Sequence, residues 1–174
     1  MPVLQLLILL VLGMIFVQDI KSRAIHWVLF PVLLLLFVAE RYLQQTRLAE
    51  SWQAVLINIG FLLTLLLIVS AYFSFREGRW VNVTAQLLGW GDILFLFSIV
   101  FYLSVLNFLF FYIVSLILIL LGWTVWQLSK KNKDKHIPLA GLQALLLGLF
   151  LACDWYWLHL NINTDDWLLK ILLK

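Results

Sequence analysis

The sequence predicts an all-α fold: a polytopic membrane protein with six transmembrane helices and a short C-terminal interfacial helix. Hydrophobic types make up 64% of the 174 residues and charged types only 12%, whereas about a quarter of a soluble domain is charged. The mean hydropathy is +1.03. This composition excludes an ordinary soluble enzyme. It also excludes a disordered chain, because disorder requires low hydrophobicity and high charge.

Polar breaks set the number and the bounds of the spans. A transmembrane helix needs about 20 apolar residues, and the polar breaks divide the chain into runs of that order. The predicted spans are 3–20, 27–44, 53–75, 90–106, 108–128 and 137–160. Residues 1–174 then form a single membrane-embedded domain, and the lipid bilayer is an expected partner.

The first span, residues 3–20, is expected to be retained. No basic region precedes this apolar run and no small-residue cleavage site follows it. A secretory signal peptide has both features. The run is therefore interpreted as a transmembrane helix of the mature protein.

Basic residues indicate how the chain is oriented. Cytoplasmic loops carry an excess of Lys and Arg. If three polar breaks face the cytoplasm, they hold eight of the 12 basic residues, namely Lys21, Arg23, Arg76, Arg79, Lys130, Lys131, Lys133 and Lys135. Two breaks on the same side require an even number of crossings between them. The long apolar run 93–128 is therefore predicted to be a helical hairpin with its turn at Asn107, and both termini are predicted to lie outside.

The last segment, residues 164–174, is too short and too polar to cross a bilayer. Thr164 is expected to cap a helix whose first residues, Asp165 and Asp166, complement the helix dipole. Charged side chains recur at a spacing of four on one side of this segment, and apolar side chains lie on the other. The pattern predicts an amphipathic helix in the membrane interface. An unstructured tail is the alternative.

Two acidic residues stand out among the nine in the chain. Acidic residues are costly within a bilayer and are often functional there. Seven have ordinary explanations in polar breaks, the tail, an interfacial ion pair or an aromatic belt: Glu40, Glu50, Glu77, Asp134, Asp154, Asp165 and Asp166. Asp19 ends the first span and Asp92 begins the fourth, so both are expected at the cytoplasmic face and at one depth.

Two carboxylates at one depth suit general acid and base catalysis. One deprotonates a water molecule while the other, protonated, polarises the scissile carbonyl. Gly89 and Gly91, just before Asp92, would let a substrate backbone or a neighbouring helix approach closely. Lys21 is expected either to anchor the first span or to act electrostatically on Asp19.

Neither a metal, a cofactor nor a nucleic acid is expected as a partner. The three histidines, His26, His136 and His159, are widely separated, whereas metal ligands usually occur in closely spaced pairs. The single cysteine, Cys153, excludes a cysteine-only zinc site within one chain. The basic residues cluster in short breaks, which is typical of a topology signal.

Three motifs together resemble a known family. They are Asp19-Ile20-Lys21, with Ile25 six residues after the aspartate, then Gly89-Trp90-Gly91-Asp92, and finally Ile137-Pro138-Leu139-Ala140 at the start of the last span. In their order and spacing they resemble the aspartic prepilin peptidases, or type IV leader peptidases. These are membrane proteases of the GxGD type. The resemblance covers most of the chain.

The resemblance implies a catalytic pair formed by Asp19 and Asp92. Residues that match the supporting motif positions are Gly89, Gly91, Lys21 and Pro138. It implies a substrate that is a type IV pilin-like precursor with a basic leader and an apolar helix. The leader would be removed at the cytoplasmic face of the bacterial inner membrane, without a cofactor.

The chain departs from the family pattern at several positions. Ile25-His26-Trp27 stands where many members have Ile-Pro-Asn, and Ile93-Leu94 stands where many have Val-Lys. These departures concern substrate preference more than the aspartate pair. Larger members carry a four-cysteine insert, so peptidase activity without a zinc element is expected here.

Two other functions are alternatives to peptidase activity. A cation-coupled transporter could use Asp19 and Asp92 as an ion site, but such sites usually lie near the bilayer midplane between repeats. No internal repeat is evident in the sequence. The second alternative is a catalytically inactive membrane assembly or scaffold protein.

Overall fold

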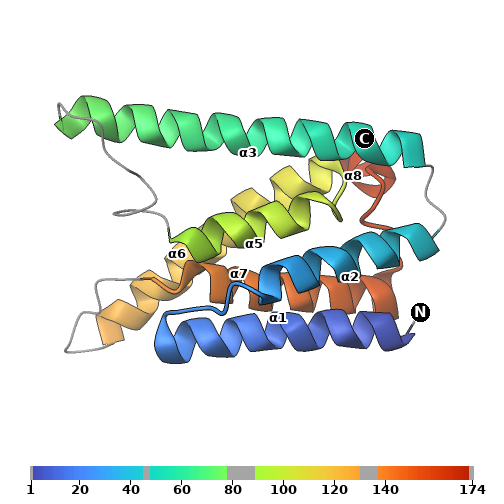
Figure 1. The fold of residues 1–174 in the computed structure, drawn as a ribbon, viewed down its shortest axis with the longest axis horizontal. Coiled ribbons are helices and arrows are strands. Elements are labelled where there is room, and N and C mark those ends of the chain that lie inside the picture. Colours follow the sequence, from blue (N-terminus) through green and yellow to red (C-terminus); the bar gives the residue numbers. More distant parts are fainter. Residues whose placement is uncertain (1, 45–47, 78–88, 130–136, 173–174) are drawn as a thin grey trace.

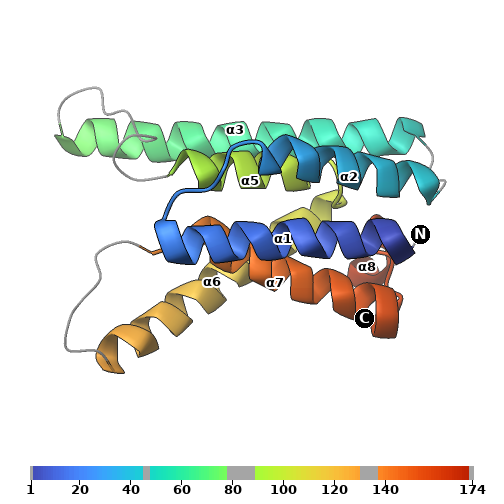
Figure 2. The ribbon, with the colours of Figure 1, turned by 60° about the horizontal axis from the view of Figure 1, so that its bottom comes forward.

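The computed structural model describes residues 2–44, 48–77, 89–129 and 137–172. The elements in these ranges are all helices: α1 (Pro2–Ser22), α2 (Leu29–Leu43), α3 (Leu48–Glu77), α5 (Trp90–Val100), α6 (Val105–Ser129), α7 (Leu139–Cys153), the π-helix η1 (Asp154–Leu158) and α8 (Asp166–Leu172). From α1 to α7, successive helices run in alternate directions along the long axis of the molecule (Figures 1 and 2). The predicted all-α fold is confirmed.

The helices differ in their capacity to cross a membrane. Within the described part of the chain, four are long and apolar enough, namely Pro2–Ser22, Trp52–Arg76, Val105–Leu128 and Leu139–Leu158. The second and fourth predicted spans fall on α2, with 15 residues, and α5, with 11. At 1.5 Å per residue these helices are about 22 Å and 16 Å long, shorter than a hydrocarbon core of about 30 Å. The long apolar helices indicate a multi-pass membrane protein.

The predicted turn at Asn107 is wrong. Helix α5 ends at Val100, and residues 101–104 connect it to α6. Asn107 lies in the first turn of α6 and is fully buried. Its amide donates to Ser104 Oγ and to the carbonyl of Ile162. The polar side chain therefore joins α6 to the C-terminal segment and does not mark a break.

The C-terminal helix begins later than predicted. Helix α8 begins at Asp166, and Thr164 does not cap it, because the Thr164 hydroxyl donates to a backbone carbonyl within the preceding turn. The Asp165 carboxylate accepts a hydrogen bond from the backbone N–H of Leu106. The Trp167 indole donates to the side chain of Asn107. The tail is thus packed against the start of α6. Residues 173–174 lie outside the described residues.

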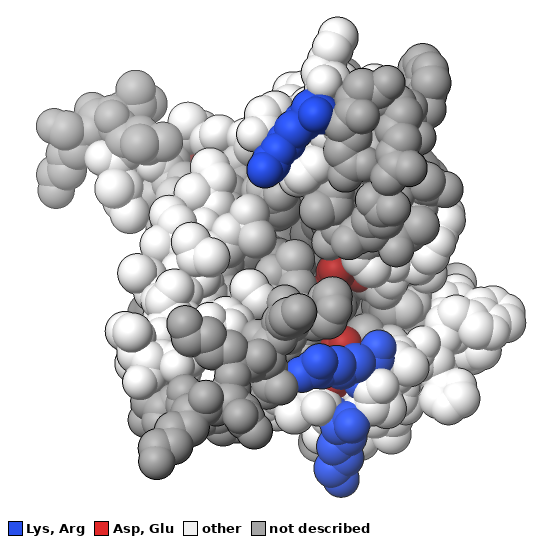
Figure 3. Space-filling view, turned by 90° about the vertical axis from the view of Figure 1, so that its left-hand side faces the viewer, with Lys and Arg blue, Asp and Glu red and all other residues white. Residues whose placement is uncertain are grey.

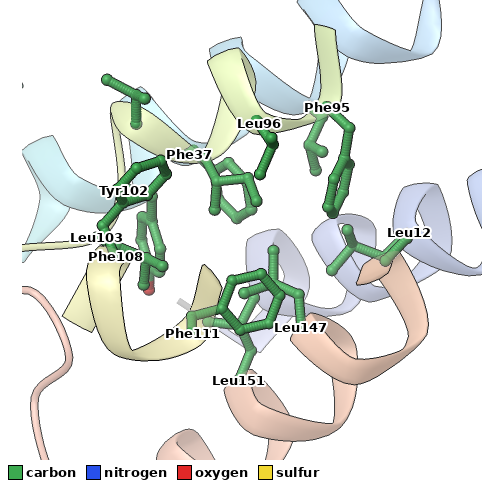
Figure 4. Close-up of a cluster of buried hydrophobic side chains, with 14 of the residues drawn as sticks. Leu12, Phe37, Phe95, Leu96, Tyr102, Leu103, Phe108, Phe111, Leu147 and Leu151 are labelled. Atoms are coloured by element: carbon green, nitrogen blue, oxygen red, sulfur yellow. The ribbon is translucent and has the colours of Figure 1, made fainter. Parts of the chain in front are cut away.

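Six helices, α1, α2, α3, α5, α6 and α7, contribute to the buried apolar core. Figure 4 shows part of it, where Leu12 of α1, Phe37 of α2, Phe95 of α5 and Leu147 of α7 point toward one another. Helix α1 packs most extensively against α7. Phe37 stacks on Tyr102 with 4.6 Å between ring centroids. These contacts fix the relative positions of α1, α5 and α7.

Buried polar side chains satisfy the backbone where α5 ends early. The last carbonyls of a helix lack partners within the helix. Arg41 Nη1 donates to the carbonyl of Phe101 at 3.0 Å, and Asn58 Nδ2 donates to that of Leu103 at 3.1 Å. Irregular backbone at membrane depth is tolerated where protein buries and pairs it. Arg41 and Asn58 therefore allow α5 to stop well short of a full span.

Some of the basic residues that were predicted to face the cytoplasm lie in the described ranges. Lys21, Arg23 and Arg76 are exposed and lie near the C-terminal ends of α1 and α3, at one end of the molecule (Figure 1). Five others lie outside the described residues: Arg79, Lys130, Lys131, Lys133 and Lys135. The described members of the set are therefore gathered at one end.

Candidate active site

The end of α1 and the start of α5 lie at the same end of the molecule, on the left in Figure 1. Asp19 lies in the last turns of α1 and is only 8% exposed. Asp92 lies in the first turn of α5 and is partly buried. The two carboxylates interact electrostatically, and both line a cavity of about 940 Å³. The structure thus brings together the two acids that the sequence singled out.

The cavity is open to one side and is lined by the end of α1, the α1–α2 connection, the start of α5, the middle of α6 and the start of α7. Its volume lies within the range of about 300–1,000 Å³ that is usual for ligand sites. Its wall is mostly apolar and includes Trp27, Phe30 and Ile119. Figure 3 views this end of the molecule, where acidic atoms are recessed between basic side chains. Asp19 and Asp92 thus line a mostly apolar cavity at this end of the molecule.

Asp92 is oriented by the residues that precede it. The backbone N–H of Gly89 donates to Asp92 Oδ2 at 3.1 Å, and the backbone N–H of Asp92 donates to the Gly89 carbonyl at 3.0 Å. An acid at this position commonly accepts a bond from the N–H of the capping residue. A Cβ added at Gly89 would lie 3.3 Å from Asp92 Oδ2. The absence of a side chain at Gly89 leaves space for the carboxylate.

Gly91 faces a neighbouring segment of the same chain. A Cβ added there would lie 3.3 Å from Ile25 Cδ1 and 3.8 Å from Phe30 Cζ. Ile25 belongs to the α1–α2 connection and Phe30 to the first turn of α2. Gly91 therefore allows the start of α5 to approach the segment that follows Asp19.

The start of α7 contacts both aspartates. The backbone N–H of Gly141 donates to Asp19 Oδ2 at 2.7 Å, and both groups are buried. The backbone of Ala140 acts as a hydrogen-bond donor toward Asp92. The first N–H groups of a helix have no partner within it and are directed toward anions. One helix end thus supplies donors to two acids from different helices.

The other predicted site residues occupy different positions. Pro138 lines the cavity and is the capping residue of α7. Lys21 is exposed and lies outside the lining. Arg23 lines the cavity and interacts electrostatically with Asp19. In the described ranges no group of three His, Cys, Asp or Glu residues could hold a metal ion.

Gly141 is the site residue that the sequence did not reveal. A Cβ added at this position would lie 2.7 Å from Asp19 Cβ. Gly141 directly follows the Ile137–Ala140 motif, which could have drawn attention to it. Glycine is common in membrane helices, however, and its partner Asp19 lies 122 residues earlier.

A second cavity, called here the α6 groove, adjoins the first. It has a volume of about 340 Å³ and is lined by Ile20, Arg23, Ile119, Gly122, Trp123, Trp126, Pro138 and Leu142. Three of these, Arg23, Ile119 and Pro138, also line the aspartate cavity. Figure 2 shows the C-terminal half of α6 diverging from α1 and α7. The α6 groove is therefore an apolar continuation of the aspartate cavity on the side of α6.

In comparisons with known proteins, no family model, curated protein or solved structure matches the chain. The geometry of the two aspartates is therefore the main support for a function.

Proposed function

We propose that the chain is a membrane aspartic endopeptidase that removes the basic leader from type IV pilin-like precursors at the cytoplasmic face of the bacterial inner membrane. One observation carries the proposal. Asp19 and Asp92, far apart in the sequence, line a single cavity and are close enough to interact electrostatically. Two such carboxylates are the groups that an aspartic protease requires.

The mechanism follows from the shared site. In the proposed mechanism the two carboxylates share one proton, because neighbouring acids do not readily ionise together. The charged member takes a proton from a water molecule, which attacks the scissile carbonyl carbon. The protonated member donates its proton to the carbonyl oxygen. The resulting tetrahedral intermediate collapses when the leaving nitrogen is protonated, and the pair returns to its initial state.

The proposal includes six membrane crossings. The alternating directions of α1, α2, α3, α5, α6 and α7 support it. The short helices α2 and α5 then traverse only part of the hydrocarbon core. The described residues that flank α5, Gly89 and 101–104, line the cavity or pair with protein groups. The exposed basic residues Lys21, Arg23 and Arg76 lie at the cavity end, which we therefore assign to the cytoplasm.

The α6 groove suggests how a membrane-anchored substrate reaches the aspartates. It is apolar, it contains Trp123 and Trp126, and it joins the aspartate cavity at Ile119. In the proposal, the apolar helix of the precursor lies in the α6 groove. The peptide bond that joins the helix to the leader then lies beside Asp19 and Asp92.

The test compares the wild type with Asp19→Asn and Asp92→Asn, each co-expressed with candidate pilin-like precursors. Asn keeps the shape of the side chain but can be neither charged nor a proton donor of the required kind. Asp166→Asn serves as the matched control, because Asp166 is exposed on α8. Leader removal is followed by the mass of the precursor and by N-terminal sequencing of the product.

We expect removal by the wild type and by Asp166→Asn, and loss of at least roughly a thousandfold in each dyad variant. Removal that survives either Asp19→Asn or Asp92→Asn would refute the pair. Absence of removal by the wild type across several precursors would instead favour an inactive assembly protein.

A further inference from the structure

The closest approach in the candidate site is between Gly141 and Asp19. The backbone N–H of Gly141 and Asp19 Oδ2 are 2.7 Å apart, and the position of a Cβ at Gly141 would be 2.7 Å from Asp19 Cβ. Asp19 Cβ is attached directly to the backbone of α1, so it cannot move aside as the tip of a long side chain can. Only glycine fits this position with the two helices at their present separation.

We propose that Gly141 is a positioning residue that fixes the Asp19 carboxylate beside Asp92 through its backbone N–H. The inference rests on the proposed proteolytic function for its kinetic consequence. The hydrogen bond from Gly141 to Asp19 and the close approach of α7 to α1 do not depend on that function.

The start of α7 performs this role because of where it begins. Pro138 is the capping residue, so the N–H groups of the next residues point away from the helix without partners in it. The N–H of Gly141 meets Asp19, and Ala140 faces Asp92. A hydrogen bond from a backbone N–H to a carboxylate is short and directional. The start of α7 therefore positions both aspartates of the pair.

The kinetic test uses Gly141→Ala with Gly148→Ala as its matched control. Both glycines lie on α7 and face α1, two turns apart. A Cβ at Gly148 would lie 3.8 Å from Leu12 Cδ1 and Leu9 Cδ2, which is ordinary van der Waals contact. The control therefore places the same substitution between the same two helices, α1 and α7, without displacing an aspartate.

We expect Gly141→Ala to lower kcat roughly 100-fold, because a displacement of about 1 Å in a reacting group can cost that much. KM is expected to stay within about threefold, since the substrate contacts are unchanged. Gly148→Ala is expected to keep both constants within about twofold. A Gly141→Ala enzyme with wild-type kcat would overturn the proposal, and so would an equal loss in the two variants.

A second measurement detects the hydrogen bond between Gly141 and Asp19 without an assay of proteolysis. Ala140-Gly141 is the only Ala-Gly step in the sequence, so protein labelled with carbonyl-¹³C alanine and ¹⁵N glycine gives a single selected amide signal in NMR. We expect the Gly141 amide proton to move upfield in Asp19→Ala, because its bond to a carboxylate is lost. Asp92→Ala should move it less.

The two measurements separate the two proposals. If the wild type cleaves no precursor, the proposed function fails, and the NMR shift still decides whether Gly141 holds Asp19. If Gly141→Ala does not fold, the NMR experiment again decides, because it uses wild-type Gly141. A Gly141 signal that is unaffected by Asp19→Ala would overturn the positioning role.

Discussion

At the scale of single residues, three glycines surround the aspartate pair and face different neighbours. Gly89 leaves space for the Asp92 carboxylate itself, and Gly91 faces the tip of Ile25. Gly141 faces the Cβ atom of Asp19. A side-chain tip can move by changing rotamer, whereas a Cβ atom moves only with its backbone. The three positions should therefore differ in their tolerance of substitution.

The contact at Gly91 can be tested by compensation. A Cβ at this position would crowd Ile25 Cδ1 at 3.3 Å. Gly91→Ala is expected to lower the free energy of unfolding by about 1 kcal/mol, which is the low end of overpacking costs. It is also expected to lower kcat/KM roughly fivefold. Ile25→Val removes the crowding atom and should restore kcat/KM to within about twofold of wild type in the double variant. Peptidase assays on the single and double variants check this.

Gly13→Ala is the control for this experiment, because nothing lies within 4 Å of a Cβ at Gly13. If kcat/KM of the double variant is no higher than that of Gly91→Ala alone, the assigned contact between Gly91 and Ile25 is contradicted. Gly91 would then act by contacting the substrate.

The sequence reveals the acids more readily than the groups that hold them. Charged residues are rare in this chain, so Asp19 and Asp92 stand out once each other acid has an ordinary explanation. Gly141 and Ile25 belong to common residue types in membrane helices. Their roles depend on distances between segments that only the folded chain brings together.

At the scale of helices, the connection between α5 and α6 explains where sequence reasoning fails. An unbroken apolar run gives no turn signal of its own. The end of α5 is fixed by Arg41 from α2 and Asn58 from α3, which pair with carbonyls of the connection. A helix boundary that depends on partners from distant helices cannot be located from the local sequence.

The α6 groove provides a test of substrate binding at this scale. Nothing lies within 4 Å of a Cβ at Gly122, so a large side chain can occupy the groove without displacing the fold. Gly122→Trp is expected to raise KM roughly tenfold, or about 1.4 kcal/mol, with little change in kcat because the aspartates are not touched. Steady-state kinetics on a purified precursor in detergent measures both constants.

Gly60→Trp is the matched control, since a Cβ at Gly60 on α3 also has nothing within 4 Å. A KM that is unchanged in Gly122→Trp, or raised equally in Gly60→Trp, would place the apolar helix of the substrate elsewhere.

At the scale of the whole molecule, the fold was the most predictable property. Each of the six predicted spans contains a helix, and four of these helices are long enough to cross a membrane. Apolar composition determines this outcome, because only helices satisfy their own backbone in lipid within one segment. Helix lengths were less predictable, since the short α5 depends on side chains supplied by other helices.

Orientation in the membrane can be tested with single cysteines in a Cys153→Ser background. Ser22 is exposed at the cavity end of α1, and Lys170 is exposed on α8. Ser22→Cys is expected to react with a membrane-impermeant maleimide only after spheroplasts are lysed. Lys170→Cys should react in intact spheroplasts, because basic residues place the cavity end in the cytoplasm. The reverse pattern, or labelling of both cysteines from one side, would exclude the proposed topology.

The short helix α2 has a consequence for the surrounding lipid. Its outer face exposes Val32, Leu35 and Val38, yet its length is only about 22 Å. In the proposed six-span topology, the bilayer relieves the hydrophobic mismatch of such a short helix by thinning locally. Helix α2 begins directly after the segment that lines the aspartate cavity. Thinning there would bring lipid headgroups and water toward the carboxylates, so the thickness of the membrane becomes part of the environment of the site.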